Sequence, residues 1–181
     1  PLKKRFPKSR LVGVDFACNM LRTANTRKSW FTRSAFVQAD ARALPFANES
    51  VDVVFSNQLL PWIANPDEVF AEVARVLRKG GVFAFATLGP DSLLEISRAW
   101  REMDDGHHVS RFPDMHNLGD GLVNAGLRNP VLDVDRLTVS YNSADALLAD
   151  LSAAGARNTL RDRSRSLTGK RKFQGMLAAL E

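Results

Sequence analysis

Short apolar, β-branched runs alternate with segments of helical period along the first two-thirds of the chain. The predicted strands cover residues 10–14, 34–38, 51–56 and 82–87. Between and after them, apolar residues recur at helical spacing in residues 17–26, 66–77 and 93–103. Strands and helices that alternate in this way are typical of βαβ units. We therefore predict an α/β fold with a mostly parallel sheet and helices on both faces.

The helix that follows Asn65 has the clearest start and end signals. Asn65 can cap the helix with its side chain, and Pro66 suits the first turn because no N–H donor is needed there. The Gly80-Gly81 pair is predicted to end the helix and to form the turn before the strand at residues 82–87. That strand is apolar on both faces, which is typical of the centre of a parallel sheet.

The pattern changes after about residue 105, where polar loops separate the elements. The predicted elements are a helix over residues 114–125 ended by Gly126, an edge or antiparallel strand over 130–141, and a helix over 143–151 ended by Gly155. Asn142 or Ser143 can cap the last of these helices. The basic tail at residues 157–172 is expected to be mobile, and residues 176–180 are expected to begin one more helix.

Length and composition indicate one globular domain. The chain has 181 residues, of which 45% are hydrophobic and 25% charged, close to the averages of globular proteins. No apolar run approaches the roughly 20 residues of a membrane-spanning helix, and no signal-peptide pattern follows the basic first residues. The single cysteine, Cys18, excludes an internal disulfide. We therefore expect a cytoplasmic protein that does not associate with membranes.

Charge is distributed unevenly, although the net charge is only +5. Residues 1–33 carry nine Lys or Arg against one Asp, for a net of +8, and residues 157–181 carry a net of +5. Residues 34–156, with nine basic and 17 acidic side chains, carry a net of −8. Basic ends attract an anionic partner such as nucleic acid, a membrane or an acidic protein, although solvated surface charge explains them equally well.

Polar residues follow three predicted strands at the point where each strand ends: Asp15, Asp40 and Asn57. In an open α/β sheet, ligands bind beyond the carboxyl ends of the strands. A carboxylate there can accept hydrogen bonds from both hydroxyls of a ribose, and a second carboxylate can accept one from the amine of a base. Each Asp also has a purely structural explanation, since Asp is common in turns. Three such residues in register favour a nucleotide-like ligand.

Four segments resemble motifs of the class I S-adenosylmethionine-dependent methyltransferases, whose fold is Rossmann-like. These segments are Val12–Leu21, Gln38–Phe46, Asp52–Asn57 and Leu77–Gly81. The resemblance implies that S-adenosylmethionine is the cofactor, that Asp15 binds its ribose, and that Asp40 binds the adenine amine. It also implies cofactor-binding roles for Phe16, Met20, Ala39, Ala41 and Asn57, although Met20 fits a place in the core equally well.

The glycine-rich motif of this superfamily, which follows its first strand, has no counterpart before Asp15. We therefore expect a single, incomplete methyltransferase domain over residues 1–181 that lacks the N-terminal strand and helix. Residues 1–105 would form the cofactor-binding half and residues 106–181 the substrate-side half. The open sheet edge could pair with a second copy of the chain.

Segments of the second half resemble one narrower family, the malonyl-[acyl-carrier-protein] O-methyltransferases of early biotin synthesis. These segments are residues 88–93, Phe112–Asp120, Asp133–Tyr141 and residues 155–158. The resemblance implies methylation of the free carboxylate of a malonyl thioester on an acidic acyl carrier protein. The basic tail would then dock the carrier protein through Arg157, Arg161, Arg163, Arg165, Lys170, Arg171 and Lys172.

A carboxylate substrate requires no general base, because it is already ionised at neutral pH. It requires a cationic or hydrogen-bonding cradle, for which Arg111 and His116 are the candidate catalytic and substrate-binding residues. A packing or capping role suits His116 as well. Leu59 and Trp62 follow Asn57 and are expected to line the substrate entrance, although Trp62 also fits a place in the core.

Two other functions remain open on the sequence alone. A different methyltransferase, acting on a small molecule or on nucleic acid, fits the basic ends. Nucleic acid is the weaker option, because the residues after Asn57 lack the Asn/Asp-Pro-Pro-Tyr type of motif found in amino-methylating enzymes. A non-methylating protein similar to a complex I assembly factor would keep the fold and bind a partner protein. No metal site is expected, since the pair His107-His108 lacks further ligands.

Overall fold

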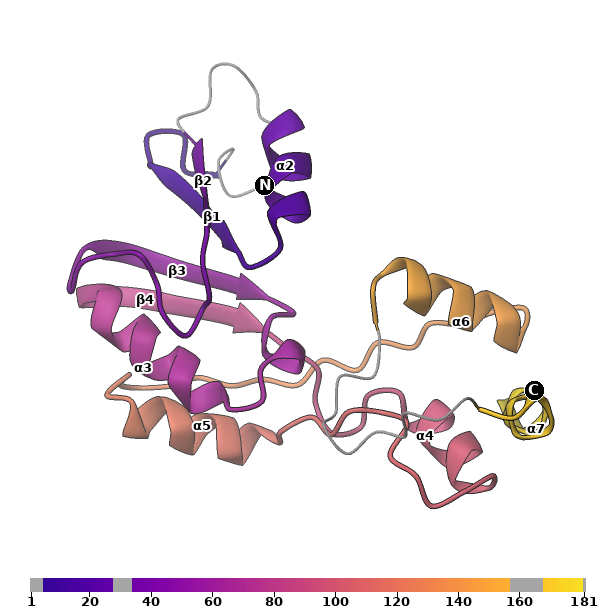
Figure 1. The fold of residues 1–181 in the computed structure, drawn as a ribbon. Coiled ribbons are helices and arrows are strands. Elements are labelled where there is room, and N and C mark those ends of the chain that lie inside the picture. The colour runs from indigo at the N-terminus through magenta and orange to yellow at the C-terminus, as the bar shows by residue number, and fades with distance from the viewer. Residues whose placement is uncertain (1–4, 28–33, 157–167, 181) are drawn as a thin grey trace. The chain divides into compact units, whose positions relative to one another are not determined.

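The computed structural model describes residues 5–27, 34–156 and 168–180 (Figure 1). In chain order its elements are β1 (Leu11–Asp15), α2 (Cys18–Thr26), β2 (Ser34–Gln38), β3 (Val51–Asn57), the 3-10 turn η1 (Leu60–Trp62), α3 (Pro66–Val76), β4 (Leu77–Ala86), α4 (Leu94–Arg101), α5 (Met115–Asn124), α6 (Ala144–Ala153) and α7 (Lys170–Leu180). The chain divides into two compact units. The first contains residues up to 56, 65–85 and 121–130, and the second contains the remainder. The α/β class is therefore confirmed.

β1 and β2 form a parallel pair that begins the first unit. Their register pairs Leu11 with Ser34 and Asp15 with Gln38, so both strands end at the same edge. α2 connects the two strands and contacts both of them. Gly13 suits β1 because a Cβ atom there would lie 2.7 Å from the Phe36 ring of β2, which would have to shift. The predicted strand–helix–strand unit at residues 10–38 is confirmed.

β3 and β4 form the second strand pair, and α3 supplies the core of the first unit. The arrows of β3 and β4 lie side by side and point in the same direction (Figure 1). Phe70 of α3 is fully buried, and its ring centroid lies 6.2 Å from those of both Phe83 and Phe85 of β4. Val73 and Val76 are also buried, which confirms the predicted apolar face of this helix. Truncating a buried aromatic such as Phe70 to Ala costs about 3–5 kcal/mol.

The predicted N-cap of α3 is confirmed, whereas its predicted end is wrong. Asn65 accepts a hydrogen bond from the backbone N–H of Asp67 (3.3 Å). The helix already ends at Val76, and the extended backbone at Leu77 begins β4. Gly80, with a φ of +77°, therefore lies within β4 rather than in a turn that precedes it. A Cβ atom on Gly81 would lie 3.0 Å from the Asp52 carbonyl oxygen, so this position also favours glycine.

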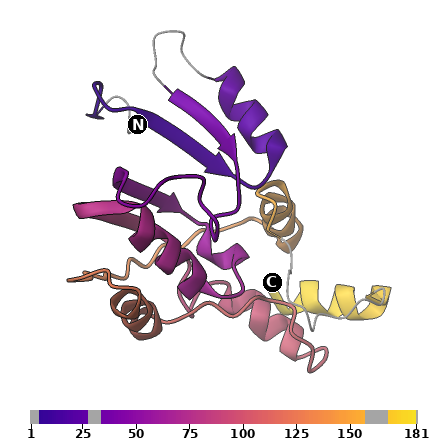
Figure 2. The same cartoon turned by 60° about the vertical axis from the view of Figure 1, so that its left-hand side comes forward.

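Helices dominate the second unit. α4 packs against α7, and α7 against α6, with Ile96, Ala99 and Met176 buried among them. Figure 2 shows the helix pair α4 and α7 from a second direction. α7 begins at Lys170, so the predicted mobile tail is helical in its last part and the predicted helix at 176–180 starts earlier. Residues 157–167 of that tail lie outside the described residues.

Two more predicted helices are confirmed, and the predicted strand between them is wrong. α5 is followed by Gly126 with a φ of +88°, and the side chain of Ser143 accepts a hydrogen bond from Ala146 N–H to cap α6. Residues 130–141 form no strand. Val131 and Leu137 are 92% and 83% exposed. A strand requires a neighbour for its hydrogen bonds, and in the described chain this segment lies on no ladder.

The four strands are grouped in two parallel pairs within the described residues. No helix in the described part of the chain is long and apolar enough to cross a membrane.

Candidate functional site

Asp15 ends β1 at the carboxyl edge of the β1–β2 pair. Its Oδ1 atom accepts a hydrogen bond from the backbone N–H of Ala17 (2.8 Å), just before α2 begins. Within the described residues, no donor contacts its second oxygen, so the carboxylate keeps acceptor capacity for a ligand hydroxyl. The turn is fixed from the other side by Gln38, whose side-chain amide donates to the carbonyl oxygen of Phe16 (2.9 Å).

Asp40 lies at the same edge, two residues beyond the end of β2. Its neighbour Ala39 donates its backbone N–H to the carbonyl oxygen of Asp15 (3.2 Å), which extends the pairing past the strand ends. Asp15 and Asp40 therefore lie at the same edge of the β1–β2 pair, as their positions after two parallel strands predict.

Arg42 holds the Asp40 carboxylate, which the sequence analysis missed. The Arg42 guanidinium donates to both oxygens of Asp40, with a shortest distance of 2.6 Å, and its backbone N–H donates to Oδ1 (2.9 Å). Hydrogen bonds from Arg42 lower the pKa of Asp40 to about 2. Asp40 is thus a firmly charged acceptor. The signal that could have found the pair is the spacing, because an Asp-x-Arg turn brings the two side chains together.

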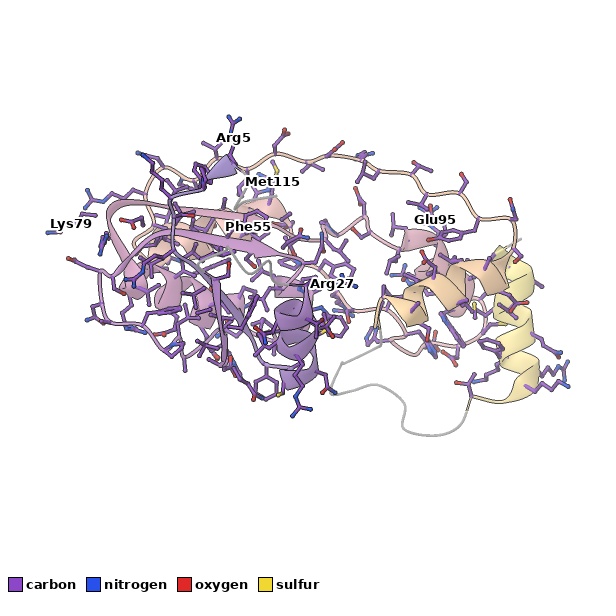
Figure 3. All side chains as sticks on the ribbon, turned by 90° about the horizontal axis from the view of Figure 1, so that it is seen from above. Arg5, Arg27, Phe55, Lys79, Glu95 and Met115 are labelled. Atoms are coloured by element: carbon purple, nitrogen blue, oxygen red, sulfur yellow. The ribbon has the colours of Figure 1, made fainter. Side chains whose placement is uncertain are left out.

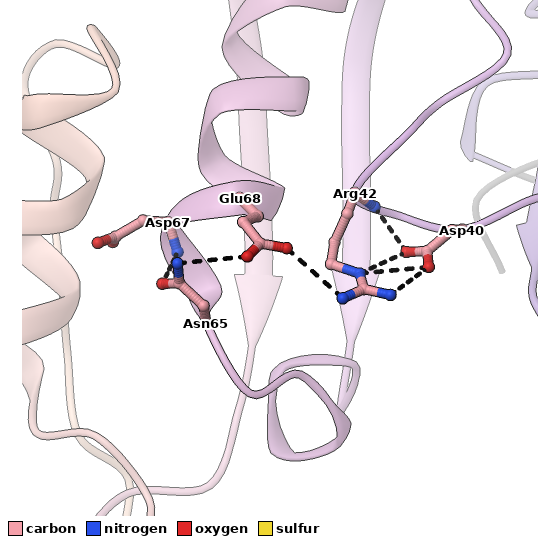
Figure 4. Close-up of polar contacts among 5 residues, drawn as sticks. All are labelled: Asp40, Arg42, Asn65, Asp67 and Glu68. Carbon is pink, nitrogen blue, oxygen red and sulfur yellow. Dashed lines mark hydrogen bonds and ion pairs between the residues drawn. The ribbon is translucent and has the colours of Figure 1, made fainter.

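The polar contacts continue from Arg42 to the start of α3 (Figure 4). Arg42 Nη1 lies 3.5 Å from the Glu68 carboxylate, and Glu68 also accepts a long hydrogen bond from the Asn65 amide. Because Arg42 and Glu68 are each about half exposed, this second ion pair contributes little to stability. It does connect the segment after β2 to the first turn of α3.

Apolar side chains lie exposed next to Asp15. Phe16 is 74% exposed and Met20, in the first turn of α2, is 59% exposed. The core position considered for Met20 is therefore wrong. Large apolar groups beside an acceptor carboxylate are suited to contact a flat heteroaromatic ring. Ala39 and Ala41 flank Asp40 and are half-buried.

A second pair missed by the sequence analysis lies on α3. Glu72 and Arg75 form an ion pair of 2.8 Å and bind the backbone of the loop that follows Asp40. The signal that could have found it is the i,i+3 spacing of opposite charges on the helix face beside that loop.

The residues predicted to line the substrate entrance follow β3. Asn57 ends the strand and is exposed, and Leu59 is half-buried just before η1. Trp62 is 49% exposed, so it is not a core residue. Ser56, the residue before Asn57, has a buried Oγ atom that makes no hydrogen bond within the described structure. A buried hydroxyl without a partner is uncommon in folded proteins.

Arg111 and His116 lie in the second unit, before and within the first turn of α5. Arg111 Nη2 contacts His107 Nε2 at 3.1 Å, and Arg111 is exposed. His116 is also exposed. Asp114, rather than His116, supplies the cap of α5, since its carboxylate accepts from Asn117 N–H (2.8 Å). The capping role considered for His116 is therefore wrong.

A separate polar cluster joins α4 to α7 within the second unit. The imidazole of His108 stacks on the ring of Trp100, with centroids 3.8 Å apart, and its Nε2 atom lies 2.7 Å from Asp104 Oδ1. Lys172 of α7 donates to the other oxygen of Asp104 (3.1 Å). Hydrogen bonds, first from His108, lower the pKa of Asp104 to about 2. In the described residues no group of three His, Cys, Asp or Glu could hold a metal ion.

Comparisons with known proteins show which families the chain resembles. Residues 1–85 match the family described as a methyltransferase domain. The chain is 43% identical over 180 residues to the malonyl-[acyl-carrier protein] O-methyltransferase of Xylella fastidiosa, covering 99% of this chain and 61% of that protein. It is 40% identical to the enzyme of the same name from Laribacter hongkongensis, covering 99% and 63%. The chain thus spans about three-fifths of the length of these relatives.

Solved structures show the same fold at low sequence identity. The YcgJ protein of Bacillus subtilis superposes with a TM-score of 0.62 over 96% of this chain and 68% of that one, at 17% identity. An S-adenosylmethionine-dependent methyltransferase of Mesorhizobium loti superposes with a TM-score of 0.52 over 65% of this chain and 63% of that one, also at 17% identity. The chain therefore shares the α/β fold of these solved structures.

Proposed function

We propose that the protein methylates the free carboxylate of a malonyl thioester carried on an acyl carrier protein, in the early steps of biotin synthesis. The observation that supports this most strongly is the similarity, across 99% of the chain, to relatives named for that reaction. The removal of the charge has a clear physical effect. It makes the malonyl chain acceptable to apolar pockets that disfavour a buried carboxylate.

The residues at the edge of β1 and β2 fit S-adenosylmethionine, the cofactor of this family. Asp15 has acceptor capacity for the ribose hydroxyls, and Asp40 is an ionised acceptor for the adenine amine. The exposed side chains of Phe16 and Met20 can contact the adenine ring. Ala39 and Ala41 would leave room beside it. When bound, the cofactor supplies a methyl group on a positively charged sulfur, which a carboxylate oxygen can attack.

The chain's own contribution to the chemistry is to bind and align the substrate carboxylate. An ionised carboxylate needs no base, so catalysis is alignment of the oxygen with the methyl group in a site that excludes water. We propose that Arg111 and His116 hold the carboxylate, because both are exposed and carry N–H donors. We propose that Asn57 faces the cofactor and that Leu59 and Trp62 line the entrance.

The partner in this proposal is an acidic carrier protein. Within the described residues, α7 offers three consecutive basic side chains, Lys170, Arg171 and Lys172, all exposed. Lys172 already pairs with Asp104, which leaves the first two for a partner. The other docking candidates, Arg157, Arg161, Arg163 and Arg165, lie outside the described residues.

Two further expectations belong to the same proposal. Residues 1–105 would bind the cofactor and residues 106–181 would meet the substrate. The two compact units interleave along the chain, so this division concerns function rather than packing.

A single exposed cysteine, Cys18, suits a reducing compartment, and we place the reaction in the cytoplasm.

The direct test supplies S-adenosylmethionine with a labelled methyl group together with malonyl-loaded carrier protein, RNA or buffer alone. The proposal predicts label on the carrier protein and none on RNA. Label on RNA would overturn the substrate. No label on any acceptor, with the cofactor bound, would favour a protein that keeps the fold without transferring a methyl group.

A further inference from the structure

Arg75, in the last turn of α3, uses all five N–H donors of its guanidinium. Nε and Nη2 donate to the two carboxylate oxygens of Glu72, both at 2.8 Å. Nη2 also donates to the carbonyl oxygen of Leu44 (2.9 Å), and Nη1 donates to the carbonyl oxygen of Phe46 (2.8 Å) and to Asn48 Oδ1 (2.9 Å). A guanidinium has five N–H donors in a planar fork, so Arg75 is fully satisfied.

Glu72 completes the contact from the acceptor side. Its Oε2 atom accepts the backbone N–H of Leu44 at 2.7 Å, so both backbone polar groups of Leu44 are bound by the pair. The Arg75 side chain is 32% exposed and that of Glu72 only 19%. The Arg75 hydrogen bonds lower the pKa of Glu72, which therefore stays charged at neutral pH.

The loop held in this way begins at the adenine-binding candidate. Asp40 and Leu44 are separated by only three residues, and Ala43 N–H donates to the Asp40 carbonyl oxygen (3.0 Å), which closes a turn. A displacement of Leu44 would therefore change the position of Asp40. Glu68, Glu72 and Arg75 lie at i, i+4 and i+7 on one face of α3. This face therefore contacts the loop after Asp40 at two places, Arg42 and Leu44.

We propose that Arg75 and Glu72 are positioning residues that fix the segment from Asp40 to Phe46 in the conformation that binds the cofactor. The inference rests on the proposed role of Asp40. Neither residue is assigned a contact with the cofactor. Both hold the segment in place before the ligand arrives, so binding does not have to order it. Arg is suited to this task and Lys is not, because only a planar fork can reach four acceptor groups at once.

The test compares Arg75→Lys and Glu72→Gln with a matched control, Arg78→Lys. Arg78 lies three residues further along the chain, in β4, and forms an exposed ion pair with Asp52 at 2.8 Å. Cofactor affinity is measured by calorimetry with S-adenosylmethionine. Folding is checked by thermal unfolding, and hydrogen exchange reports on the Leu44 amide of the unliganded protein.

We expect Arg75→Lys to weaken cofactor binding about tenfold, since two or more loop hydrogen bonds are lost. Glu72→Gln should weaken it less, and the control should match the parent. Hydrogen exchange at the Leu44 amide should accelerate in both Arg75→Lys and Glu72→Gln. The kcat at saturating cofactor should stay close to that of the parent. Such a split between affinity and turnover indicates positioning and would not follow from a merely structural role.

Two results would count against the inference, and they differ. If the parent binds the cofactor and Arg75→Lys binds it as tightly as Arg78→Lys does, the positioning role is wrong while the proposed function stands. If the parent itself does not bind the cofactor, the proposed function fails and the inference fails with it. Because Arg75→Lys keeps the charge, a folded variant is expected, and Glu72→Gln provides a second route to the same measurement.

Discussion

Asp15 and Asp40 carry the same carboxylate in different surroundings. Asp15 accepts one backbone hydrogen bond and leaves an oxygen without a donor in the described structure, whereas both oxygens of Asp40 already receive hydrogen bonds from Arg42. A ligand at Asp15 therefore meets unused acceptor capacity. A ligand at Asp40 must share the carboxylate with an arginine or displace it.

We expect Asp15→Ala to weaken S-adenosylmethionine binding more than Asp40→Ala does. A ribose offers two hydroxyls to Asp15, and each charge-assisted hydrogen bond contributes about 1.5–3 kcal/mol. The adenine amine offers one such bond to Asp40. Calorimetric titration of both variants, with Asp91→Ala as a control at an exposed site, measures the difference. Equal losses, or a larger loss at Asp40, would show that the two carboxylates have been assigned the wrong roles.

At the scale of elements, α3 joins the core to the candidate site. One face buries Phe70, Val73 and Val76, and another carries the charged residues that hold the loop after β2. The position of the first turn of α3 therefore affects both the core and the loop after β2. The N-cap that fixes this turn can be tested on its own.

Removing the cap of α3 should destabilise the protein measurably. We expect Asn65→Ala to lower the free energy of unfolding by about 1 kcal/mol, because the Asp67 N–H loses its acceptor. Ser143→Ala, which removes the cap of α6, is the matched comparison and should have a similar cost. Urea denaturation followed by circular dichroism gives both values. A change near zero for Asn65→Ala would mean that solvent replaces the cap.

The cluster between α4 and α7 gives a prediction about pH. Asp104 has its pKa lowered from 3.8 to about 2, so its charge stabilises the folded state. That contribution is fully present above pH 3.8 and is lost as the pH falls through about 2. The difference in unfolding free energy between the parent and Asp104→Asn should therefore shrink over this range. The neighbouring Asp105→Asn is the control, and a difference that stays constant down to pH 2 would contradict the ion-pair explanation.

The sequence predicted the helices and strands better than it predicted the contacts between them. Asn65, Gly126 and Ser143 act locally, so their helix signals could be read directly. The strand expected at residues 130–141 failed because a strand depends on a partner that local pattern does not reveal. At the site, two parallel strands predicted that Asp15 and Asp40 would share an edge. The Asp-x-Arg and i,i+3 spacings were available as signals for Arg42 and Arg75, but spacing alone does not show that an arginine binds its neighbour's carboxylate in the folded chain.

At the scale of the whole molecule, charge separates two basic ends from an acidic middle. Exposed charges act mainly on the rate of encounter with a partner, and salt screens them beyond about 8 Å at physiological ionic strength. The basic start of α7 is the described part of the C-terminal basic region.

Neutralising α7 should slow the encounter with an acidic carrier protein. We expect Lys170→Gln with Arg171→Gln to lower kcat/KM at low salt and to approach the parent at high salt. Arg128→Gln with Arg136→Gln removes the same charge from other exposed positions and is the control. Turnover across a salt series separates the outcomes. If the α7 variant follows the control at every ionic strength, these side chains are only solvated surface.

The central claim is that the methyl group goes to the free carboxylate of a malonyl thioester. The most direct measurement is mass spectrometry of carrier protein loaded with malonyl or with acetyl groups, after incubation with the protein and S-adenosylmethionine. The two acyl groups differ by the carboxylate alone. The account predicts that the acyl group of malonyl carrier protein gains one methyl group, and that acetyl carrier protein gains none. Methylation of both proteins, or of the polypeptide instead of the malonyl group, would contradict it.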